Sequence, residues 1–146
     1  MESLVIYDSN HGNTRKIAET VAEILGAPAV SVSDAGPEHF SGLGLVVVGS
    51  PILGWKPSER TQAFLAALKK EQLKGVKAAA FDTRVKLFIH GDAAGKIAKV
   101  LADAGAEMIS EPQPFYVKGK EGPLFEGEIE KARAWAATLK ANAGPA

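Results

Sequence analysis

Cysteine is absent from this sequence of 146 residues, and that absence removes several kinds of chemistry. Without a thiol the chain forms no disulfide, no thiolate metal site and no cysteine nucleophile. Any redox chemistry must therefore belong to a bound group. The three histidines, His11, His39 and His90, show neither an HExxH motif nor a close carboxylate spacing, so we expect no metal site.

Long apolar runs and an excess of one charge are also missing. No apolar run is long enough to cross a bilayer, and no basic, apolar leader precedes the first strand pattern. The 17 lysines and arginines balance the 17 aspartates and glutamates, which argues against a surface for nucleic acid or anionic membrane. We therefore expect a cytoplasmic protein that binds neither nucleic acid nor membrane.

Apolar segments without polar alternation recur along the chain and predict strands that are covered on both faces. They lie at residues 4–7, 45–48 and 76–81, with shorter candidates at 29–32 and 108–109. Helical periods at 13–25, 58–68, 94–101 and 129–139 separate them, whereas the glycines and proline of 35–42 permit only a turn. This alternation predicts one doubly wound α/β domain over residues 1–141, followed by a frayed tail at 142–146.

The boundaries of these helices carry their own signals. Ser58 and Asp92 stand where N-cap residues belong, and Gly105 stands where a glycine commonly ends a helix. Residues 118–127, with three glycines and Pro123, predict a loop before the last helix.

The turn after the first strand has the sequence SNHGNT at residues 9–14. Hydroxyl groups, amide groups, a glycine and the start of a helix meet there, and together they suit a phosphate group. The chain has neither GxxxxGK[ST] nor GxGxxG, so a terminal phosphate held by neutral donors is the reading that remains. Ordinary turn and cap chemistry is the alternative.

These residues give the chain a family resemblance. The segment Ser9 to Thr14 resembles the phosphate loop of flavodoxins, usually Thr/Ser-x-Thr-Gly-Asn-Thr, although His11 replaces a threonine. Residues 46–68 resemble the flavodoxin third strand, second flavin loop and third helix, and residues 81–85 resemble the exit of the fourth strand. The resemblance implies a five-stranded parallel sheet of order 2-1-3-4-5 with helices on both faces.

The resemblance also implies FMN as the cofactor and three loops that bind it. The expected cofactor-binding residues are Ser9, Asn10, His11, Gly12, Asn13, Thr14, Ser50, Pro51, Ile52, Leu53, Gly54, Trp55, Asp82, Thr83, Arg84, Val85 and His90.

Trp55 would lie beside the flavin ring, with packing against the third helix as the alternative. Because a glycine peptide turns over at little steric cost, a carbonyl beside Gly54 could meet flavin N5 after reduction. Flavodoxins often cover the outer flavin face with a tyrosine that this chain lacks, which leaves Phe88, His90 and Arg84 as candidates. Residues 87–89 are equally well interpreted as a short buried strand or lid.

The function that follows is FMN-dependent electron transfer between a reductase and an acceptor protein, by a monomer or weak dimer. No catalytic side chain is expected, because the flavin supplies the chemistry. We therefore favour an electron carrier over a self-sufficient enzyme. The alternatives are an FMN-dependent NAD(P)H:quinone-type reductase and a flavodoxin-like domain that has lost flavin. A phospho-receiver is disfavoured because Asp8 stands alone after the first strand.

Overall fold

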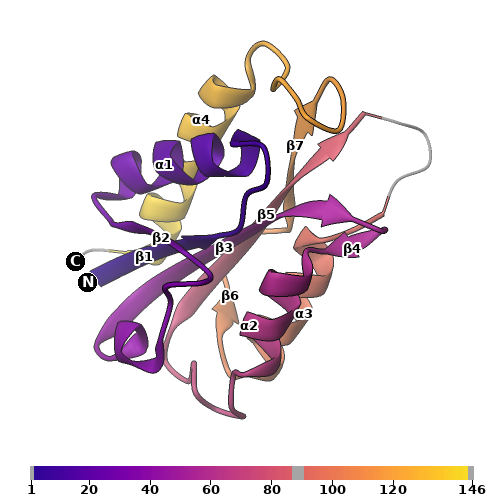
Figure 1. The fold of residues 1–146 in the computed structure, drawn as a ribbon. Helices are drawn as coiled ribbons and strands as arrows, with labels where there is room; N and C mark the ends of the chain where they lie inside the picture. Colours follow the sequence, from indigo (N-terminus) through magenta and orange to yellow (C-terminus); the bar gives the residue numbers. More distant parts are fainter. Residues whose placement is uncertain (1, 87–90, 145–146) are drawn as a thin grey trace.

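A computed structural model describes residues 2–86 and 91–144 of the chain. These residues form one sheet with helices on both faces (Figure 1). The strands are β1 (Glu2–Tyr7), β2 (Ala29–Ser31), β3 (Leu43–Leu53), β4 (Lys56–Pro57), β5 (Lys77–Val85), β6 (Glu107–Met108) and β7 (Gln113–Val117). The helices are α1 (Asn13–Leu25), α2 (Glu59–Ala66), α3 (Ala94–Asp103), α4 (Glu128–Ala143) and a 3-10 turn, η1 (Pro37–Phe40).

The strands pair in the order β2-β1-β3-β5, and both β6 and β7 pair with the outer edge of β5. All of these pairs are parallel. With β6 and β7 sharing the fifth position, the predicted order 2-1-3-4-5 is confirmed. The weak segment 35–42 holds only η1, also as predicted.

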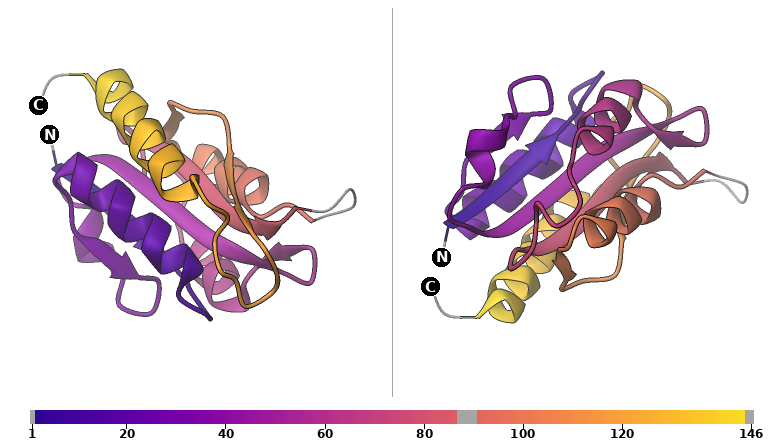
Figure 2. Two further views of the ribbon diagram at one scale, coloured as in Figure 1. Left: turned by 90° about the horizontal axis from the view of Figure 1, so that it is seen from above. Right: turned by 90° about the horizontal axis from the view of Figure 1, so that it is seen from below.

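Two apolar clusters cover the two faces of the sheet. Alternate strand residues face opposite ways, so Val5 and Val47 join the cluster under α1 and α4. Their neighbours Leu4 and Val46 join the cluster under α2 and α3. Figure 2 shows the two helix pairs on opposite sides of the sheet. This two-sided burial explains why the predicted strands have no polar alternation.

The two central strands are longer than predicted. β3 continues to Leu53 and β5 to Val85, so Ser50 and Asp82 lie in strands rather than in loops. The pairing of Gly49 with Phe81 explains part of this, because the Phe81 ring would come within 2.0 Å of a Cβ at position 49. A glycine that signals a turn in sequence is here a contact within the sheet.

The edge of the sheet also differs from the prediction. Only the short β6 corresponds to the expected strand at 108–109, and the chain then crosses Pro112 before β7 begins. The antiparallel pairing of β4 with Ile52 and Leu53 was not predicted either, because two residues carry no periodic signal.

The ends of the helices follow the predicted signals, with one correction. Ser58 Oγ accepts the N–H of Thr61 at 3.2 Å, and Asp92 Oδ1 accepts the N–H of Gly95 at 2.9 Å. The last helix, however, continues to Ala143, whose carbonyl accepts a hydrogen bond from Lys77 Nζ at 3.0 Å. The predicted frayed tail from residue 142 is therefore wrong at its first two positions. None of the helices in the described residues is long and apolar enough to cross a membrane.

Candidate functional site

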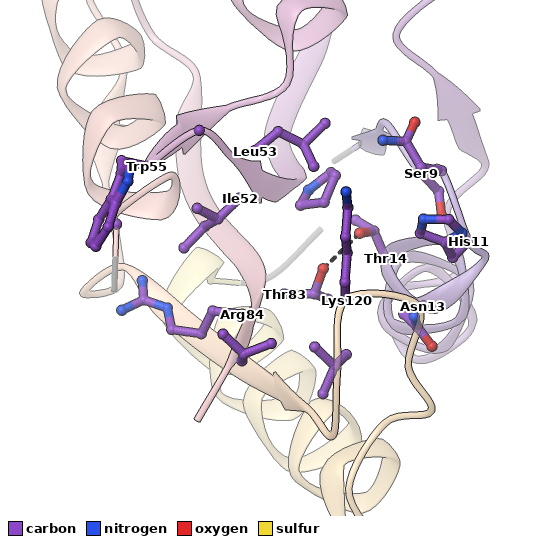
Figure 3. Close-up of a pocket in the computed structure, with 16 residues that line it drawn as sticks. Ser9, His11, Asn13, Thr14, Ile52, Leu53, Trp55, Thr83, Arg84 and Lys120 are labelled. Carbon is purple, nitrogen blue, oxygen red and sulfur yellow. Dashed lines mark hydrogen bonds between the residues drawn. The ribbon is translucent and has the colours of Figure 1, made fainter. Parts of the chain in front are cut away.

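A cavity of about 480 Å³ opens at the edge of the sheet where β1, β3 and β5 end (Figure 3). In a doubly wound sheet this edge is where ligands bind. The described residues that line it are Ser9, Asn10, His11, Asn13, Thr14, Pro51, Ile52, Leu53, Gly54, Trp55, Thr83, Arg84, Val85, Gly91, Val117 and Lys120.

The turn between β1 and α1 forms one end of the cavity. Gly12 adopts a φ of 88°, and Ser9 Oγ accepts the N–H groups of Gly12 at 3.0 Å and Arg15 at 3.3 Å. Within the described residues, the N–H groups of Asn13 and Thr14 have no hydrogen-bond partner. They belong to the first turn of α1, where the helix dipole also favours an anion.

A polar network beneath this turn joins it to the start of α2. Asp8 is 3% exposed and accepts hydrogen bonds from the N–H of Ser9, from Ser58 Oγ and from Arg60 Nε. Arg60 Nη2 also donates to Asn10 Oδ1 at 2.8 Å. Arg60 therefore neutralises a buried carboxylate that would otherwise repel an anion at the turn.

The hairpin between β3 and β4 forms the opposite end. Its two central residues both have positive φ, 59° at Gly54 and 71° at Trp55, as a two-residue type I′ turn requires. For tryptophan this conformation is strained. The Trp55 side chain is exposed, while its carbonyl accepts the N–H of Asp92 at 3.1 Å.

Gly91 packs directly against the backbone of the hairpin at Trp55. A Cβ on Gly91 would lie 2.2 Å from Cα of Trp55, so only glycine lets the two backbones approach this closely. Gly91 therefore fixes the hairpin against the segment that leads into α3.

The end of β5 carries a buried ion pair. Arg84 Nε and Nη2 donate to the two carboxylate oxygens of Asp82 at 2.9 and 2.6 Å. Asp82 also accepts the N–H groups of Ala93 and Ala94 at the start of α3. The hydrogen bond with Asp82 raises the pKa of Arg84 despite its burial, so the guanidinium stays charged.

A hydroxyl pair connects the first turn with β5. Thr14 Oγ1 and Thr83 Oγ1 lie 2.8 Å apart, and both side chains are buried at the floor of the cavity.

Most residues that the sequence placed in the site line the cavity, but three described ones do not. Gly12 shapes the turn. Ser50 Oγ accepts the backbone N–H of Ser58 at 3.0 Å, and the Asp82 carboxylate accepts hydrogen bonds from Arg84 and from the start of α3. Ser50 and Asp82, which the sequence placed among the cofactor-binding residues, lie behind the cavity wall and hold Ser58, Arg84 and the start of α3. His90, and the segment 87–89 with Phe88, lie outside the described residues.

Three lining residues were not predicted: Gly91, Val117 and Lys120. Val117 belongs to β7, a strand that the sequence analysis did not predict, and Lys120 belongs to the loop that follows it. No local motif singles out Lys120. Within the described residues no three or more His, Asp or Glu side chains gather in a way that would hold a metal ion.

Comparisons with known proteins identify the family. Residues 4–110 match the family model of the flavodoxin domain, and this chain belongs to that family. Membership of this family supports flavin binding and electron transfer as the general function of the chain.

One curated relative and two solved structures describe the similarity further. Coenzyme F420H(2) oxidase of Methanothermobacter marburgensis is 28% identical over 150 residues, which cover 93% of this chain and 35% of the oxidase. The chain thus spans about a third of that relative.

A flavodoxin from the domain Archaea has a TM-score of 0.81 at 18% identity, covering 98% of this chain and 99% of its own. Rubredoxin oxygen:oxidoreductase of Desulfovibrio gigas has a TM-score of 0.78 at 21% identity, covering 97% of this chain and 36% of its own. At these identities the structures support the fold alone.

Proposed function

We propose that this chain binds FMN noncovalently and carries electrons one at a time between redox-partner proteins. The observation that carries the proposal is the two-ended cavity. Free N–H groups at the start of α1 form one end, and the apolar and aromatic residues of the β3–β4 hairpin form the other. FMN has the same polarity, with an anionic phosphate at one end and a largely apolar ring system at the other.

The size and chemistry of the cavity fit this ligand. A volume of about 480 Å³ lies within the range for small-molecule sites. Ile52, Leu53, Val85 and Val117 supply apolar surface, and no aspartate or glutamate is among the described lining residues. An anionic, partly apolar ligand therefore meets neither a repelling carboxylate nor a wholly polar wall.

The roles of the walls follow from their positions. The turn at 9–14 would hold the phosphate, and the segments 51–55 and 83–85 would flank the ring. The bound flavin supplies the redox chemistry, while the protein orients it and limits its access to water. The Thr14–Thr83 hydrogen bond and the Asp82–Arg84 ion pair hold the walls together without the ligand.

The φ angles of the hairpin are compatible with an exchange between two turn types. Turning over the peptide between Gly54 and Trp55 converts a type I′ turn into type II′, which keeps positive φ at glycine and returns Trp55 to negative φ. The hypothesis that a carbonyl near Gly54 meets flavin N5 remains a prediction, and this exchange would reverse the direction of the Gly54 carbonyl.

Partner proteins and compartment remain part of the proposal. A carrier of this kind accepts electrons from a reductase and passes them to an acceptor, working as a cytoplasmic monomer or weak dimer. The overall charge balance of the chain indicates that steering toward partners depends on local charges rather than on a strong net charge.

The first experiment is to purify the protein without added flavin, record its visible spectrum and reduce it stepwise without oxygen. A flavin spectrum with two resolved one-electron steps supports the carrier. Direct two-electron reduction, together with rapid oxidation of NADH or NADPH by quinone, favours the reductase. A colourless protein that titration with FMN leaves unchanged would mean a domain that has lost flavin.

The similarity to an oxidase favours a second candidate function. Because the match covers nearly all of this chain but only 35% of the oxidase, the chain would serve as the electron-delivering module of an oxidase system. Anaerobic stopped-flow mixing of the reduced chain with a candidate oxidase tests this. Fast flavin reoxidation supports it, and a rate no faster than with an unrelated flavodoxin argues against it.

A further inference from the structure

A tight turn after β7, residues 118–123, forms a wall of the cavity that the sequence did not reveal. The N–H of Lys118 donates to the carbonyl of Pro123 at 2.8 Å, and the N–H of Gly122 donates to the carbonyl of Gly119 at 2.9 Å. These two bonds close the segment into a compact loop, which we call the 118–123 turn.

The 118–123 turn is seated on the start of α1. Asn13 is a buried residue, at 8% exposure, and its Nδ2 donates to the carbonyl of Glu121 at 3.1 Å. Gly122 has a φ of 100°, and a Cβ there would lie 2.6 Å from Asn13 Nδ2. The residue that opens α1 therefore also fixes the position of the turn.

This seating brings Lys120 into the lining of the cavity, where Figure 3 draws it among the other lining side chains. Within the described residues, Lys120 Nζ has neither an ion-pair partner nor a hydrogen bond. Lys118, two residues earlier, points elsewhere: its Nζ lies 6.0 Å from the centre of the Phe125 ring, and it does not line the cavity.

Lys120 differs from Arg84, which also lines the cavity, in how its charge is paired. Arg84 is bound to Asp82 at 2.6 Å and approaches Asp92 at 3.4 Å, so its charge is already compensated. Since none of the described lining residues is acidic, the charge of Lys120 is not offset within the cavity wall. An anionic group entering this cavity gains the attraction of Lys120 without having to displace a carboxylate.

We infer that Lys120 is a specificity-determining residue that favours a flavin carrying a phosphate over one without it. The inference rests on the proposed function. The uncharged N–H groups of α1 and the ammonium group of Lys120 would act on the same phosphate, one by hydrogen bonding and the other by charge. Because Lys120 is exposed to solvent, its contribution is about three- to fivefold in affinity rather than many orders of magnitude.

The test is a titration of the flavin-free protein with FMN and with riboflavin, followed by flavin fluorescence, for the wild type, Lys120→Gln and Lys118→Gln. We expect Lys120→Gln to weaken FMN binding by about three- to fivefold and to leave riboflavin binding unchanged. Its FMN affinity should also depend less on salt concentration. Lys118→Gln, which removes the same charge from the same turn, should match the wild type.

A second variant tests the seating of the turn. In Gly122→Ala the added methyl group meets the Asn13 side chain that holds the carbonyl of Glu121, and alanine is strained at a φ of 100°. Both effects should displace the turn that carries Lys120, so FMN affinity should fall while riboflavin affinity changes less. Urea unfolding of the flavin-free variant establishes that it is folded.

The outcomes separate the two proposals. If the wild type binds neither flavin, the proposed function falls and this inference falls with it. If the wild type binds FMN and Lys120→Gln binds it equally well, only the inference is overturned. Equal weakening of FMN and riboflavin, or an equal effect of Lys118→Gln, would also overturn it, because either result means a structural or general charge effect.

Discussion

The hydroxyl oxygens of Thr14 and Thr83 lie 2.8 Å apart, and their hydrogen bond joins the first turn of α1 to the end of β5. The two residues are separated by 69 positions in the sequence. Both residues are nearly inaccessible to solvent, at 2% and 6% exposure, so water does not readily replace either partner. Two walls of the cavity are thus connected within the protein itself.

Removal of this bond should lower stability by a measurable amount. Thr83→Val keeps the shape of the side chain but leaves the Thr14 hydroxyl without its partner, at a cost of about 1 to 2 kcal/mol in the free energy of unfolding. Thr83→Ser, which keeps the hydroxyl, should cost less. Urea unfolding of the flavin-free protein measures both. Thr20→Val, at a half-buried position on α1 where the hydroxyl donates only to the helix carbonyl of Lys16, is the control and should stay within about 0.5 kcal/mol. Equal losses for Val and Ser at position 83 would contradict the role of the hydroxyl.

The ion pair at the end of β5 predicts a larger effect. Asp82→Asn removes the charge that compensates Arg84, whose side chain is only 10% exposed. Breaking a buried pair in this way costs about 3 to 5 kcal/mol. Denaturant unfolding checks the value, with Asp103→Asn as the matched control, since Asp103 pairs with Lys99 on the surface. A loss for Asp82→Asn as small as that of the control would show that the pair contributes little.

The same ion pair makes a prediction about pH. Its hydrogen bond raises the pKa of Arg84 in the folded protein above the value in the unfolded chain. The resulting stability is therefore fully present below the unfolded pKa and is lost only as pH rises through the folded pKa, in the strongly alkaline range. Arg84 should add no slope to a plot of unfolding free energy against pH around neutrality. A slope there that Arg84→Met abolishes would contradict this assignment.

Gly91 should not tolerate even the smallest side chain. In Gly91→Ala the new Cβ meets the backbone of Trp55, which cannot rotate away as a side chain would. We expect a loss of about 1 to 3 kcal/mol in unfolding free energy, together with weaker FMN binding because the hairpin is displaced. Gly119→Ala is the control: its Cβ would meet nothing closer than 3.9 Å. Unchanged stability and flavin affinity in Gly91→Ala would mean that the two backbones move apart without cost.

Trp55 predicts opposite effects on stability and on binding. Trp55→Gly relieves a tryptophan held at positive φ, so the flavin-free protein should be as stable as the wild type or more stable by up to about 1 kcal/mol. Loss of the ring should nevertheless weaken FMN binding by about fivefold, the worth of one aromatic contact. Such opposite signs are typical of backbone strain kept for function.

Trp135 provides the contrast for this measurement. Its ring packs against Phe81 and Phe115 in the core, and its Nε1–H donates to Ser110 Oγ at 3.0 Å. In Trp135→Phe, the remaining tryptophan fluorescence should be quenched as FMN binds. In Trp55→Phe, quenching should be weaker. The reverse order would place the flavin away from the hairpin.

The parts of the fold that sequence predicted are those with local signals. The buried strands, the Ser58 cap and the weak second helix each depend on residue types within a few positions of one another. The turn at 9–14 was found for the same reason, since its donors are consecutive in the chain.

The remainder depends on contacts between distant segments. β7 pairs with β5 through residues 113–117, but Pro114 within it argues against a strand when the sequence is considered alone. Asp82 stands beside Thr83 in the sequence, and only the folded structure shows that its side chain is buried and paired with Arg84. Nothing near Lys120 in sequence places it in the cavity, because Asn13 holds the turn that carries it.

The residues that line the cavity extend from Ser9 to Lys120 in the sequence. Under the proposed function, a bound flavin would therefore depend on the folding of nearly the whole domain. Because the lining residues come from segments far apart in the sequence, unfolding would separate the walls that hold the ligand under the proposed function. Under the proposed function, free FMN at a hundred times its dissociation constant adds about 2.7 kcal/mol to folding. In a living cell, vitamin supply would then govern not only how much of this protein is active but also how much escapes proteolysis.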